Sequence, residues 1–382
     1  MTSHPIQYQS PLWRALGSED LDLEVLYLSR HGIGDSVDLD FGQVVHWDND
    51  VLAGFEHRFV TDRVRVTPGG PLSGLTLKLV QTIVTARFDA LLVMGYATAG
   101  YLLSALTAAT VRLPLYLRGE TMSAGARRAM GRDRPTDAAR RGLLRGLLRL
   151  CAGAFPIGHD SELFYRELGV PAARLTPAPY GVDNSWFRRR GPAEIETLRD
   201  DLGLDPQRRL VLQTGKLIAR KRPHHAAEVA AELRLRGIDA AAIIVGSGPL
   251  ETTVRAAMAD SDLFVGFVNQ SQLPAFYALA DVLLMPSTYE TWGLVVNEAL
   301  AAGTPVVASP QVPAAVEMAG GARGGAVQVV GPTHPGPWAD ACEAVLARNR
   351  GAVAQDAMAA VDPYDVRSTA RRIAERIRAD FE

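Results

Sequence analysis

The carboxyl-terminal half of the chain alternates short apolar runs with longer segments of mixed polarity. The apolar runs lie at 210–212, 242–245, 264–268, 282–285 and 304–308. Short continuous apolar runs predict strands that are buried on both faces, and the mixed segments between them predict helices. This repeated order of strand and helix is typical of a parallel sheet in an α/β domain.

The amino-terminal half shows a similar but less regular pattern. Strands are predicted at Leu23 to Leu28, Ala90 to Met94, Leu113 to Leu117 and Ala154 to Ile157. The segment from Pro192 to Asp205 is predicted to be an interdomain linker with helical stretches inside it. A length of 382 residues suits two domains of ordinary size.

One uncharged stretch, from Ala90 to Val111, is long enough to suggest a transmembrane helix. Gly95, Thr98, Gly100 and Ser104 interrupt its apolar character. We therefore predict a buried strand, a turn and a helix in this stretch instead.

The amino terminus lacks the buried apolar strand that should open a domain of this kind. The chain begins Met1-Thr2-Ser3-His4-Pro5-Ile6-Gln7-Tyr8, which looks like only the loop after such a strand. We hypothesise that the true amino terminus lies upstream of Met1, or that the chain was trimmed. Loops at the carboxyl ends of strands line the ligand-binding edge of such domains, so His4 is a candidate ligand-site residue. A plain turn histidine is the alternative.

Charge and cysteine content exclude some function classes. The net charge is −2 and the isoelectric point is near 6.5, so the chain has no electrostatic footprint for nucleic acid. Its two cysteines, Cys151 and Cys342, are too few for a disulfide framework. A reducing cytoplasm is therefore the expected location.

Two carboxylates flank a glycine turn in the segment Glu290-Thr291-Trp292-Gly293-Leu294-Val295-Val296-Asn297-Glu298. Glu290 is predicted on a loop before a helix, and Glu298 about two turns further along it, roughly 12 Å away. Trp292, Gly293 and Leu294 then form the first turn, where unpaired N–H groups favour an anion. Hydroxyls held at both ends with a phosphate between them describe a nucleotide sugar. Two solvated carboxylates on an ordinary helix are the alternative.

Lysine usage points to a phosphate site. The chain has 40 basic residues but only three lysines, Lys78, Lys216 and Lys221. Two of the three lie in one loop that follows the apolar run at 210–212. Lysine is a compact charge suited to phosphate oxygens, and loops at the carboxyl ends of strands in open α/β sheets bind phosphates. A solvated basic turn is the alternative.

Together, these two segments resemble the carboxyl-terminal domain of the retaining glycosyltransferases of family 4, which have the GT-B fold. The resemblance covers about residues 205 to 325. In that family a glycine, arginine and lysine loop holds the donor diphosphate, and the matching positions are Gly215, Lys216 and Lys221. The chain departs from the family pattern at Lys216, where arginine is usual, and at Arg222, where glycine is usual. Charge is kept, but a bidentate contact to phosphate is lost.

The resemblance also implies roles for the acid pair. Glu290 is expected near the sugar hydroxyls and Glu298 on the ribose, with Lys216, Lys221 and Glu290 as the catalytic set. Gly246 and Gly248 match a glycine-rich turn of the family, although taken alone they suit any strand-to-helix turn. The implied donor-binding residues are Gly215, Gly246, Gly248, Phe267, Val268, Thr291, Trp292, Gly293, Leu294 and Glu298.

The fold implied is α/β GT-B, with two Rossmann-like parallel-sheet domains facing across a cleft. We place an acceptor-binding domain at 1–190, a donor-binding domain at 191–361, and a carboxyl-terminal helix that returns to the first domain at 362–382.

Acceptor-side residues are harder to assign from the resemblance. Arg118 and Glu120 follow a predicted strand and should emerge from its carboxyl end into the cleft. His4 is the third acceptor-side candidate. Relatives often carry a histidine near here and this chain does not, which puts a general-base role in doubt. The segments Asp40-Phe41-Gly42 and Trp47-Asp48 also resemble acceptor-side segments of one branch of such enzymes.

Residues 127–149 contain eight arginines beside leucines at helical spacing. A weak peripheral contact with an anionic membrane is one interpretation. A surface helix with a solvated basic face is the other.

The predicted activity is that of a retaining glycosyltransferase. It would move a sugar from a nucleoside diphosphate sugar, UDP or GDP being favoured, to an acceptor hydroxyl with an α link. The resemblance implies that no metal or other cofactor is needed. The alternatives are a sugar-nucleotide epimerase and a noncatalytic nucleotide-sugar-binding subunit on the same fold. The sequence leaves the acceptor and the oligomeric state open.

Overall fold

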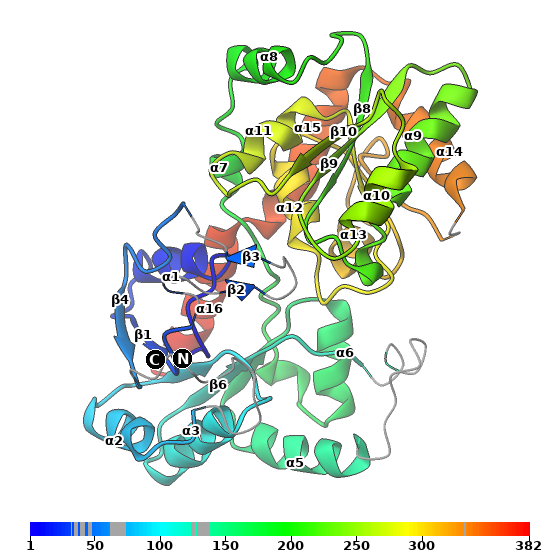
Figure 1. Ribbon diagram of the computed structural model, residues 1–382. Helices are drawn as coiled ribbons and strands as arrows, with labels where there is room; N and C mark the ends of the chain where they lie inside the picture. Colours follow the sequence, from blue (N-terminus) through cyan, green and yellow to red (C-terminus); the bar gives the residue numbers. More distant parts are fainter. Residues whose placement is uncertain are drawn as a thin grey trace. The chain divides into compact units, whose positions relative to one another are not determined.

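The chain forms two compact units in the computed structural model (Figure 1). Unit 1 comprises Met1–Gly34, Asp50–Tyr180 and Val366–Glu382, and unit 2 comprises Asp35–Asn49 and Gly181–Asp365. The structure describes residues 1–31, 33, 37–38, 43–44, 48–61, 74–123, 127, 137–331 and 334–382. The predicted acceptor-side segments at 40–42 and at Trp47 lie outside the described residues.

Unit 2 is built on a six-stranded sheet with the order β10-β9-β8-β11-β12-β13. Its strands are β8 (Arg209–Thr214), β9 (Ala240–Val245), β10 (Leu263–Gly266), β11 (Val282–Met285), β12 (Val306–Ala308) and β13 (Val327–Val329). Every pairing in this sheet is parallel. The carboxyl ends of all six strands therefore lie along one edge.

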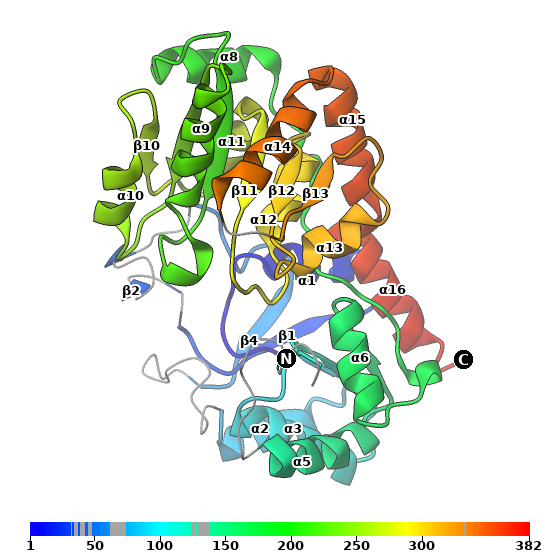
Figure 2. The ribbon, with the colours of Figure 1, turned by 90° about the vertical axis from the view of Figure 1, so that its right-hand side faces the viewer.

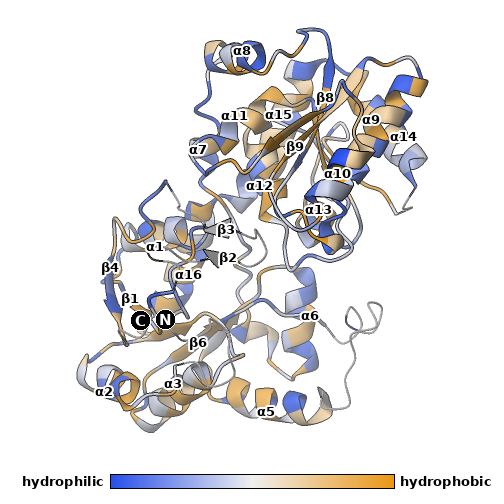
Figure 3. Cartoon of the chain, in the orientation of Figure 1, coloured by the Kyte–Doolittle hydropathy of each residue, from blue (hydrophilic) through white to orange (hydrophobic). Residues whose placement is uncertain are grey.

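Helices cover both faces of this sheet. The helical segments of unit 2 are α7 (Asn184–Phe187), α8 (Pro192–Asp201), η2 (Ala219–Lys221), α9 (His225–Leu235), α10 (Glu251–Ala257), α11 (Leu273–Leu279), α12 (Leu294–Ala301), α13 (Pro313–Ala319), α14 (Pro335–Leu346), α15 (Arg350–Val361) and η3 (Asp362–Tyr364). Figures 1 and 2 show α9, α10 and α14 on one face and α11, α12 and α15 on the other. Strand β9 and the Leu210–Leu212 part of β8 between them are apolar and fully buried, and β9 takes the hydrophobic colour in Figure 3, as expected for strands buried on both faces.

Unit 1 contains a second set of parallel strands. They are β1 (Glu24–Tyr27), which pairs with β4 (Glu56–Phe59), and β5 (Leu91–Val93), β6 (Leu115–Arg118) and β7 (Gly153–Phe155), which pair in that order. Its helical segments are α1 (Ser10–Gly17), α2 (Leu77–Thr85), α3 (Ala99–Thr110), α5 (Asp137–Arg149), α6 (His159–Glu167), η1 (Ala172–Arg174) and α16 (Val366–Arg378). Helix α16 packs on α1, so the last helix of the chain belongs to unit 1.

The first residues of the chain join the two groups of strands in unit 1. The Thr2 amide donates to the Leu26 carbonyl at 2.9 Å, and the Met94 amide donates to the Met1 carbonyl at 2.9 Å. The Met1 ammonium donates to the Leu92 carbonyl at 2.6 Å, and burial lowers its pKa to about 5. The prediction that this segment is only a loop is therefore wrong for Met1 to Ser3, which lie alongside strands.

Most predicted elements are confirmed. The predicted strands at 23–28, 90–94, 113–117 and 154–157 correspond to β1, β5, β6 and β7. The stretch at 90–111 forms β5, a turn and α3, and no helix among the described residues is long and apolar enough to span a membrane.

The helix of the acid pair differs from prediction at its start. Helix α12 begins at Leu294 with Gly293 as its N-cap, so Trp292 precedes the first turn. The φ of +104° at Gly293, which a glycine adopts without strain, ends the preceding extended segment and lets the helix begin there.

A small antiparallel pair, β2 (Val37–Asp38) and β3 (Gln43–Val44), is also part of unit 2. Near it, the Asp48 carboxylate accepts from the Ser271 amide at 3.2 Å, and the Asp48 amide donates to the Asn269 side chain at 3.3 Å. These bonds connect a segment of the amino-terminal half of the sequence to the connection between β10 and α11.

Asp262 is a buried carboxylate that fixes one edge of the unit 2 sheet. Its side chain has no solvent exposure. It accepts from the Ala242 amide and from the Arg234 guanidinium, both at 2.8 Å, and from the Ala259 amide at 2.9 Å. The carboxylate thus ties β9 and α9 to the segment that leads into β10.

Replacing Asp262 with alanine should destabilise unit 2 strongly, because two amides and a partly buried guanidinium lose their acceptor. We expect the free energy of unfolding to fall by about 3–5 kcal/mol, measured by urea denaturation. Asp239→Ala is the matched control, since Asp239 is 57% exposed and pairs with Arg208 at the surface. The control should cost less than about 1 kcal/mol. Equal losses in the two variants would contradict this assignment.

Candidate functional site

The loops that follow β8 and β11 meet at the carboxyl edge of the unit 2 sheet. The two strands are neighbours, with Val211 opposite Val282. Beyond them, the Thr288 amide donates to the Arg220 carbonyl at 2.7 Å, and the Arg220 guanidinium donates to the Tyr289 carbonyl at 3.0 Å. The loop with the lysines is therefore bonded directly to the loop that carries the first acid of the pair.

Glu290 lies at the centre of this junction. Its Oε1 is 3.1 Å from the Lys221 Nζ and accepts from the Ser287 hydroxyl at 2.9 Å. Its Oε2 is 3.0 Å from the Arg220 Nη1. The Glu290 side chain is only 9% exposed, against 14% for Lys221 and 41% for Arg220. One nearly buried carboxylate thus holds two cations at the edge of the sheet.

The protonation of Glu290 follows from these contacts. Burial by itself raises the pKa of the carboxyl, but the charges of Lys221 and Arg220, with hydrogen bonds from Arg220 and Ser287, outweigh burial and hold the pKa below 4.5. Glu290 is therefore ionised at neutral pH.

Three glycines allow the strand ends to approach closely enough to form this edge. A Cβ on Gly246 would lie 1.9 Å from the Gly215 carbonyl oxygen, and a Cβ on Gly248 would lie 2.8 Å from backbone atoms of Leu217. Gly215 has a φ of +115°, and the Lys221 ammonium lies 3.6 Å from the position a Cβ on Gly215 would take. The glycines thus leave room for the backbone and for the lysine above it.

The second acid, Glu298, belongs to a separate hydrogen-bonded group. The Tyr277 hydroxyl donates to its Oε2 at 2.6 Å and lies 3.2 Å from the Thr214 hydroxyl. Burial raises the pKa of Glu298 above 4.5, while the Tyr277 hydrogen bond and the Lys221 charge partly offset that rise. Lys221 therefore acts electrostatically on both acids, as expected for residues of one site.

Between the two acids, the Trp292 side chain is turned into the core. The Trp292 indole is 2% exposed and donates to the Asn297 side chain at 2.9 Å, so it is held in the core. By helix geometry the Leu294 and Val295 amides have no partner inside α12, whereas the Val296 amide donates to the Gly293 carbonyl at 2.9 Å. An anion beside Gly293 would meet these amides and the positive end of the helix dipole.

The remaining predicted donor residues lie on the same edge of the sheet. Gly215 and Lys216 directly follow β8, and Phe267 and Val268 directly follow β10. Thr291 directly follows Glu290. Lys216, Phe267, Val268 and Thr291 are all half-buried, and their contacts with a donor stay predictions.

In unit 1, Arg118 is not placed as expected. Its side chain is 1% exposed, and its Nη2 donates to the Ala178 and Pro179 carbonyls at 3.1 and 3.3 Å. Its guanidinium carbon lies 4.4 Å from the centre of the Tyr180 ring. The expectation that this charge emerges at the strand end is therefore wrong, because the guanidinium turns inward to hold the segment at 178–180.

Glu120 and His4 differ from Arg118 in exposure. Glu120 is exposed, and its Oε1 accepts from the hydroxyls of Tyr180 at 3.2 Å and Tyr8 at 3.5 Å. The His4 Nδ1 is 2.8 Å from the Ser3 hydroxyl, and the His4 ring makes an edge contact with His31. Burial and the neighbouring His31 lower the pKa of His4 to about 4, so His4 is neutral at pH 7.

Two site residues, Arg220 and Tyr277, were not predicted individually. Arg220 stands next to Lys221 in the basic loop, so its position was a usable signal. Tyr277 is the only polar side chain in the α11 sequence Leu273–Leu279. Its pairing with Glu298 depends on the packing of α11 beside α12, which local sequence does not show.

Among the described residues, no group of three or more histidine, cysteine, aspartate or glutamate side chains is arranged to hold a metal ion.

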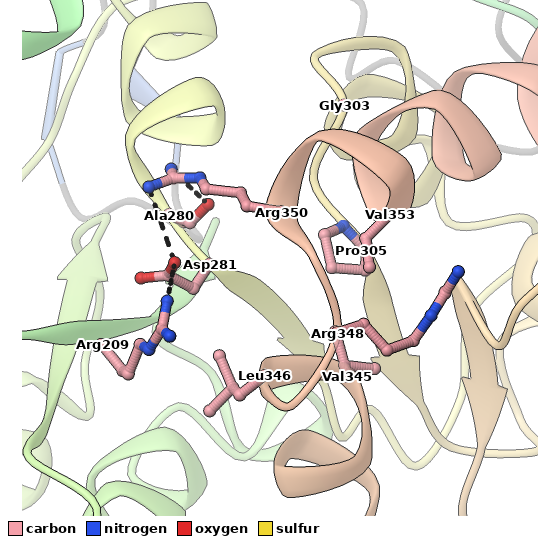
Figure 4. Close-up of a pocket in the computed structure, with 10 residues that line it drawn as sticks. All are labelled: Arg209, Ala280, Asp281, Gly303, Pro305, Val345, Leu346, Arg348, Arg350 and Val353. Carbon is pink, nitrogen blue, oxygen red and sulfur yellow. Dashed lines mark hydrogen bonds and ion pairs between the residues drawn. The ribbon is translucent and has the colours of Figure 1, made fainter.

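A pocket at the opposite edge of the unit 2 sheet belongs to the structural framework of this unit rather than to the candidate site (Figure 4). Its wall includes Asp281, whose carboxylate accepts from the Leu210 amide at 2.8 Å and lies 3.4 Å and 3.5 Å from the guanidinium groups of Arg209 and Arg350. The enclosed volume of about 20 Å³ holds about one water molecule. Arg209, Asp281 and Arg350 pair with one another at the amino ends of β8 and β11, away from Glu290, and Arg348 pairs with Asp356 instead.

The family match found by comparison with known proteins lies within unit 2. Residues 194–349 match the family model for glycosyl transferases group 1. This match covers the described site from Gly215 to Glu298, and it confirms the family resemblance predicted from the sequence.

Relatives of similar sequence are named as glycosyltransferases. The chain is 36% identical over 171 residues to 2-deoxystreptamine glucosyltransferase of Streptomyces kanamyceticus, covering 43% of this chain and 44% of that protein. It is 31% identical over 233 residues to D-inositol 3-phosphate glycosyltransferase 2 of Catenulispora acidiphila, covering 57% of this chain and 51% of that protein. The chain thus spans about half the length of these curated relatives.

Solved structures of similar fold cover nearly the whole chain. The Anabaena protein Alr3699/HepE in complex with UDP and glucose superposes on 99% of this chain and 100% of its own, with a TM-score of 0.69 and 18% identity. WaaG, a glycosyltransferase involved in lipopolysaccharide biosynthesis, superposes on 98% of each chain with a TM-score of 0.67 and 17% identity. These likenesses confirm the predicted GT-B fold of two Rossmann-like units.

The ion cluster at Glu290 should make stability depend on pH in a defined direction. Because the folded pKa of Glu290 is lowered below 4.5, the unfolded state takes up its proton first, and the stabilisation is lost as pH falls through the folded pKa. Glu290→Gln removes this group. We therefore expect the difference in melting temperature between wild type and the variant to be largest near neutral pH and to shrink below about pH 4. A difference that is constant from pH 7 to about pH 3 would show that the cluster contributes no linked stability.

Proposed function

We propose that this chain, whose residues 194–349 belong to the glycosyl transferases group 1, transfers a sugar from a nucleoside diphosphate sugar to an acceptor hydroxyl with retention, giving an α link. The observation that carries the proposal is the cluster of Lys221, Arg220 and Glu290 beside the amino-terminal end of α12. It brings cations, helix amides and a carboxylate to one edge of a parallel sheet, which is where open α/β domains bind nucleotides.

The cations and the helix end suit the donor diphosphate. Lys221, with Lys216 on the same loop, supplies positive charge, and the first amides of α12 supply hydrogen-bond donors. As the bond between sugar and diphosphate breaks, negative charge grows on the leaving group. Fixed positive groups lower the energy of that transition state, and we propose that they do so without a metal ion or other cofactor.

The two acids suit the hydroxyl groups of the donor. Glu298, held by Tyr277, is proposed to accept from the ribose, and Glu290 from the transferred sugar. Phe267 and Val268, directly after β10, are proposed to contact the base. UDP and GDP are both candidates, since HepE was solved with UDP and one Mycobacterium tuberculosis relative is named as GDP-mannose-dependent.

The acceptor is proposed to bind through unit 1. Glu120 is exposed and held by two tyrosine hydroxyls, so it has acceptor capacity left for a substrate hydroxyl. His4, neutral at pH 7, is a second candidate. Arg118 acts on this surface indirectly, through the segment at 178–180 that it holds.

A reducing location agrees with the state of the cysteines. Cys151 and Cys342 are both buried free thiols, and burial raises the pKa of each to about 12. We propose a cytoplasmic enzyme on this basis.

The exposed face of α5 is proposed to make a weak contact with anionic lipid. Leu143 is 58% exposed and Leu150, just past the helix, is 43% exposed. Arg140, Arg145 and Arg149 are exposed on the same helix. Apolar side chains flanked by arginines are typical of a surface that binds anionic membranes.

The decisive experiment is a nucleotide panel on wild type and on Lys221→Ala. UDP, GDP and ADP, then their sugars, are tested by thermal shift, where a ligand at about 100 times its dissociation constant adds about 2.7 kcal/mol of stability. One nucleotide series should stabilise wild type and not the variant. In a transfer assay with EDTA present, the variant should lose about 2–4 kcal/mol of transition-state stabilisation, and NMR of the product should show an α link.

Lys78→Ala is the matched control, because Lys78 is the third lysine of the chain and lies in unit 1. It should leave nucleotide binding unchanged. Binding without transfer to any acceptor would indicate a noncatalytic subunit, and conversion of the donor alone would indicate an epimerase. Undiminished turnover of Lys221→Ala would contradict the proposed role of the lysine loop.

Vesicle sedimentation tests the membrane surface. Wild type should sediment with vesicles rich in phosphatidylglycerol more than with phosphatidylcholine vesicles, and the attraction should weaken with salt. Leu143→Ser should reduce sedimentation severalfold, because an apolar side chain no longer enters the bilayer interface. Leu235→Ser is the control, since Leu235 is 84% exposed on α9 of unit 2. Equal effects of the two substitutions would exclude a specific role for α5.

A further inference from the structure

In this structure both oxygens of the Glu290 carboxylate already have partners, so the carboxylate is not free to bind a sugar. Both of its carboxylate oxygens contact cations, Oε1 the Lys221 ammonium at 3.1 Å and Oε2 the Arg220 guanidinium at 3.0 Å, and Oε1 also accepts from Ser287. An ionised carboxylate has about four lone-pair positions. Three of them are used here. The same cations are the groups that a diphosphate would need.

A bound diphosphate would therefore compete with Glu290 for the same two cations, Lys221 and Arg220. A carboxylate carries one negative charge, whereas a diphosphate carries at least two and offers several oxygens to the same groups. Phosphate oxygens and carboxylate oxygens use the same charge-assisted hydrogen bonds from lysine and arginine. A diphosphate close to Lys221 would also repel the Glu290 carboxylate.

We propose that Glu290 is a built-in counter-ion that the donor diphosphate replaces, and that the carboxylate released in this exchange then binds the hydroxyls of the donor sugar. The inference rests on the proposed function and concerns the same site. It makes Glu290 a positioning residue in two steps. It first holds Lys221 and Arg220 in place, and it then orients the sugar once the diphosphate has taken them over.

In the proposed exchange the side chains change partners while backbone contacts hold both loops in place. The Glu290 amide donates to the Gln311 carbonyl at 3.0 Å, which fixes the backbone on one side. The Lys221 carbonyl accepts from the Gln213 side chain at 3.1 Å, and the Lys221 amide donates to the Ile218 carbonyl at 3.0 Å, which fix the other.

The exchange predicts an order of recognition. Inorganic pyrophosphate alone should be able to release Glu290, because it supplies the charges that replace it. A free sugar should bind poorly without a diphosphate, because the carboxylate it needs is occupied. A nucleoside diphosphate sugar satisfies both requirements in one ligand.

The test is calorimetric titration of UDP or GDP, whichever the panel selects, and of pyrophosphate into wild type and Glu290→Gln. Removing the competing carboxylate should tighten both ligands, roughly threefold to tenfold at low salt, with a smaller gain at high salt. The transfer rate should fall in the same variant, because the sugar loses an acceptor. A merely structural role for Glu290 would weaken binding, so tighter binding separates the two accounts.

Glu343→Gln is the matched control, since it removes the same charge from an exposed position of α14 paired with Arg236. It should leave both affinities unchanged. Glu290→Asp provides a second variant with a shorter carboxylate, and it should give an intermediate gain in affinity. Weaker or unchanged pyrophosphate binding in Glu290→Gln, in a variant that melts as a folded protein, would overturn the inference.

The proposed function can fail separately. If wild type binds neither nucleotides nor pyrophosphate, the diphosphate site itself is wrong. If wild type binds them and Lys221→Ala does not, while Glu290→Gln brings no gain, the glycosyltransferase proposal stands and only the counter-ion exchange is refuted.

Discussion

The site depends on one constraint, which is that the backbones just beyond β8 and β9 nearly touch while β11 pairs with the other side of β8. Gly246 and Gly215 approach so closely that a single methyl group at Gly246 would overlap a carbonyl oxygen. Parallel pairing puts the loops after β8 and β11 next to each other. Two cations and a carboxylate from different loops can then share ion pairs at distances near 3 Å.

The charge behaviour of the two acids follows from their different partners. Glu290 is nearly buried yet stays ionised because two cations accompany it, whereas the direct side-chain partner of Glu298 among the described residues is the Tyr277 hydroxyl, and burial raises the Glu298 pKa. Two carboxyl groups eight positions apart in sequence therefore differ in charge behaviour. The difference suits the two proposed roles, in which Glu290 balances the charge of the cations and Glu298 accepts hydrogen bonds from the uncharged hydroxyl groups of the donor.

Sequence was sufficient for unit 2 because its signals are local. Buried strands are continuous apolar runs, the glycine turns have fixed spacing, and two of three lysines stand in one loop, so the strands and the position of Glu290 were predictable. The ion pair of Arg220 with Glu290 and the bond of Tyr277 to Glu298 were not, since they join segments far apart in sequence. In unit 1 the same limit was more severe. The residue Arg118 follows an apolar run and looked solvent-directed, but a ring and two carbonyls from 178–180 draw its side chain inward.

The bond between the loops after β8 and β11 has a consequence for how the chain acquires its shape. Arg220 and Tyr289 are 69 positions apart, so their contact closes a long stretch of chain and cannot form before the central strands have paired. The Arg220–Tyr289 contact adds no stability to the individual helices while the sheet is incomplete. We therefore expect the edge that carries Glu290 to become ordered only after β8 and β11 have paired, so that its order would report a native centre of the unit 2 sheet.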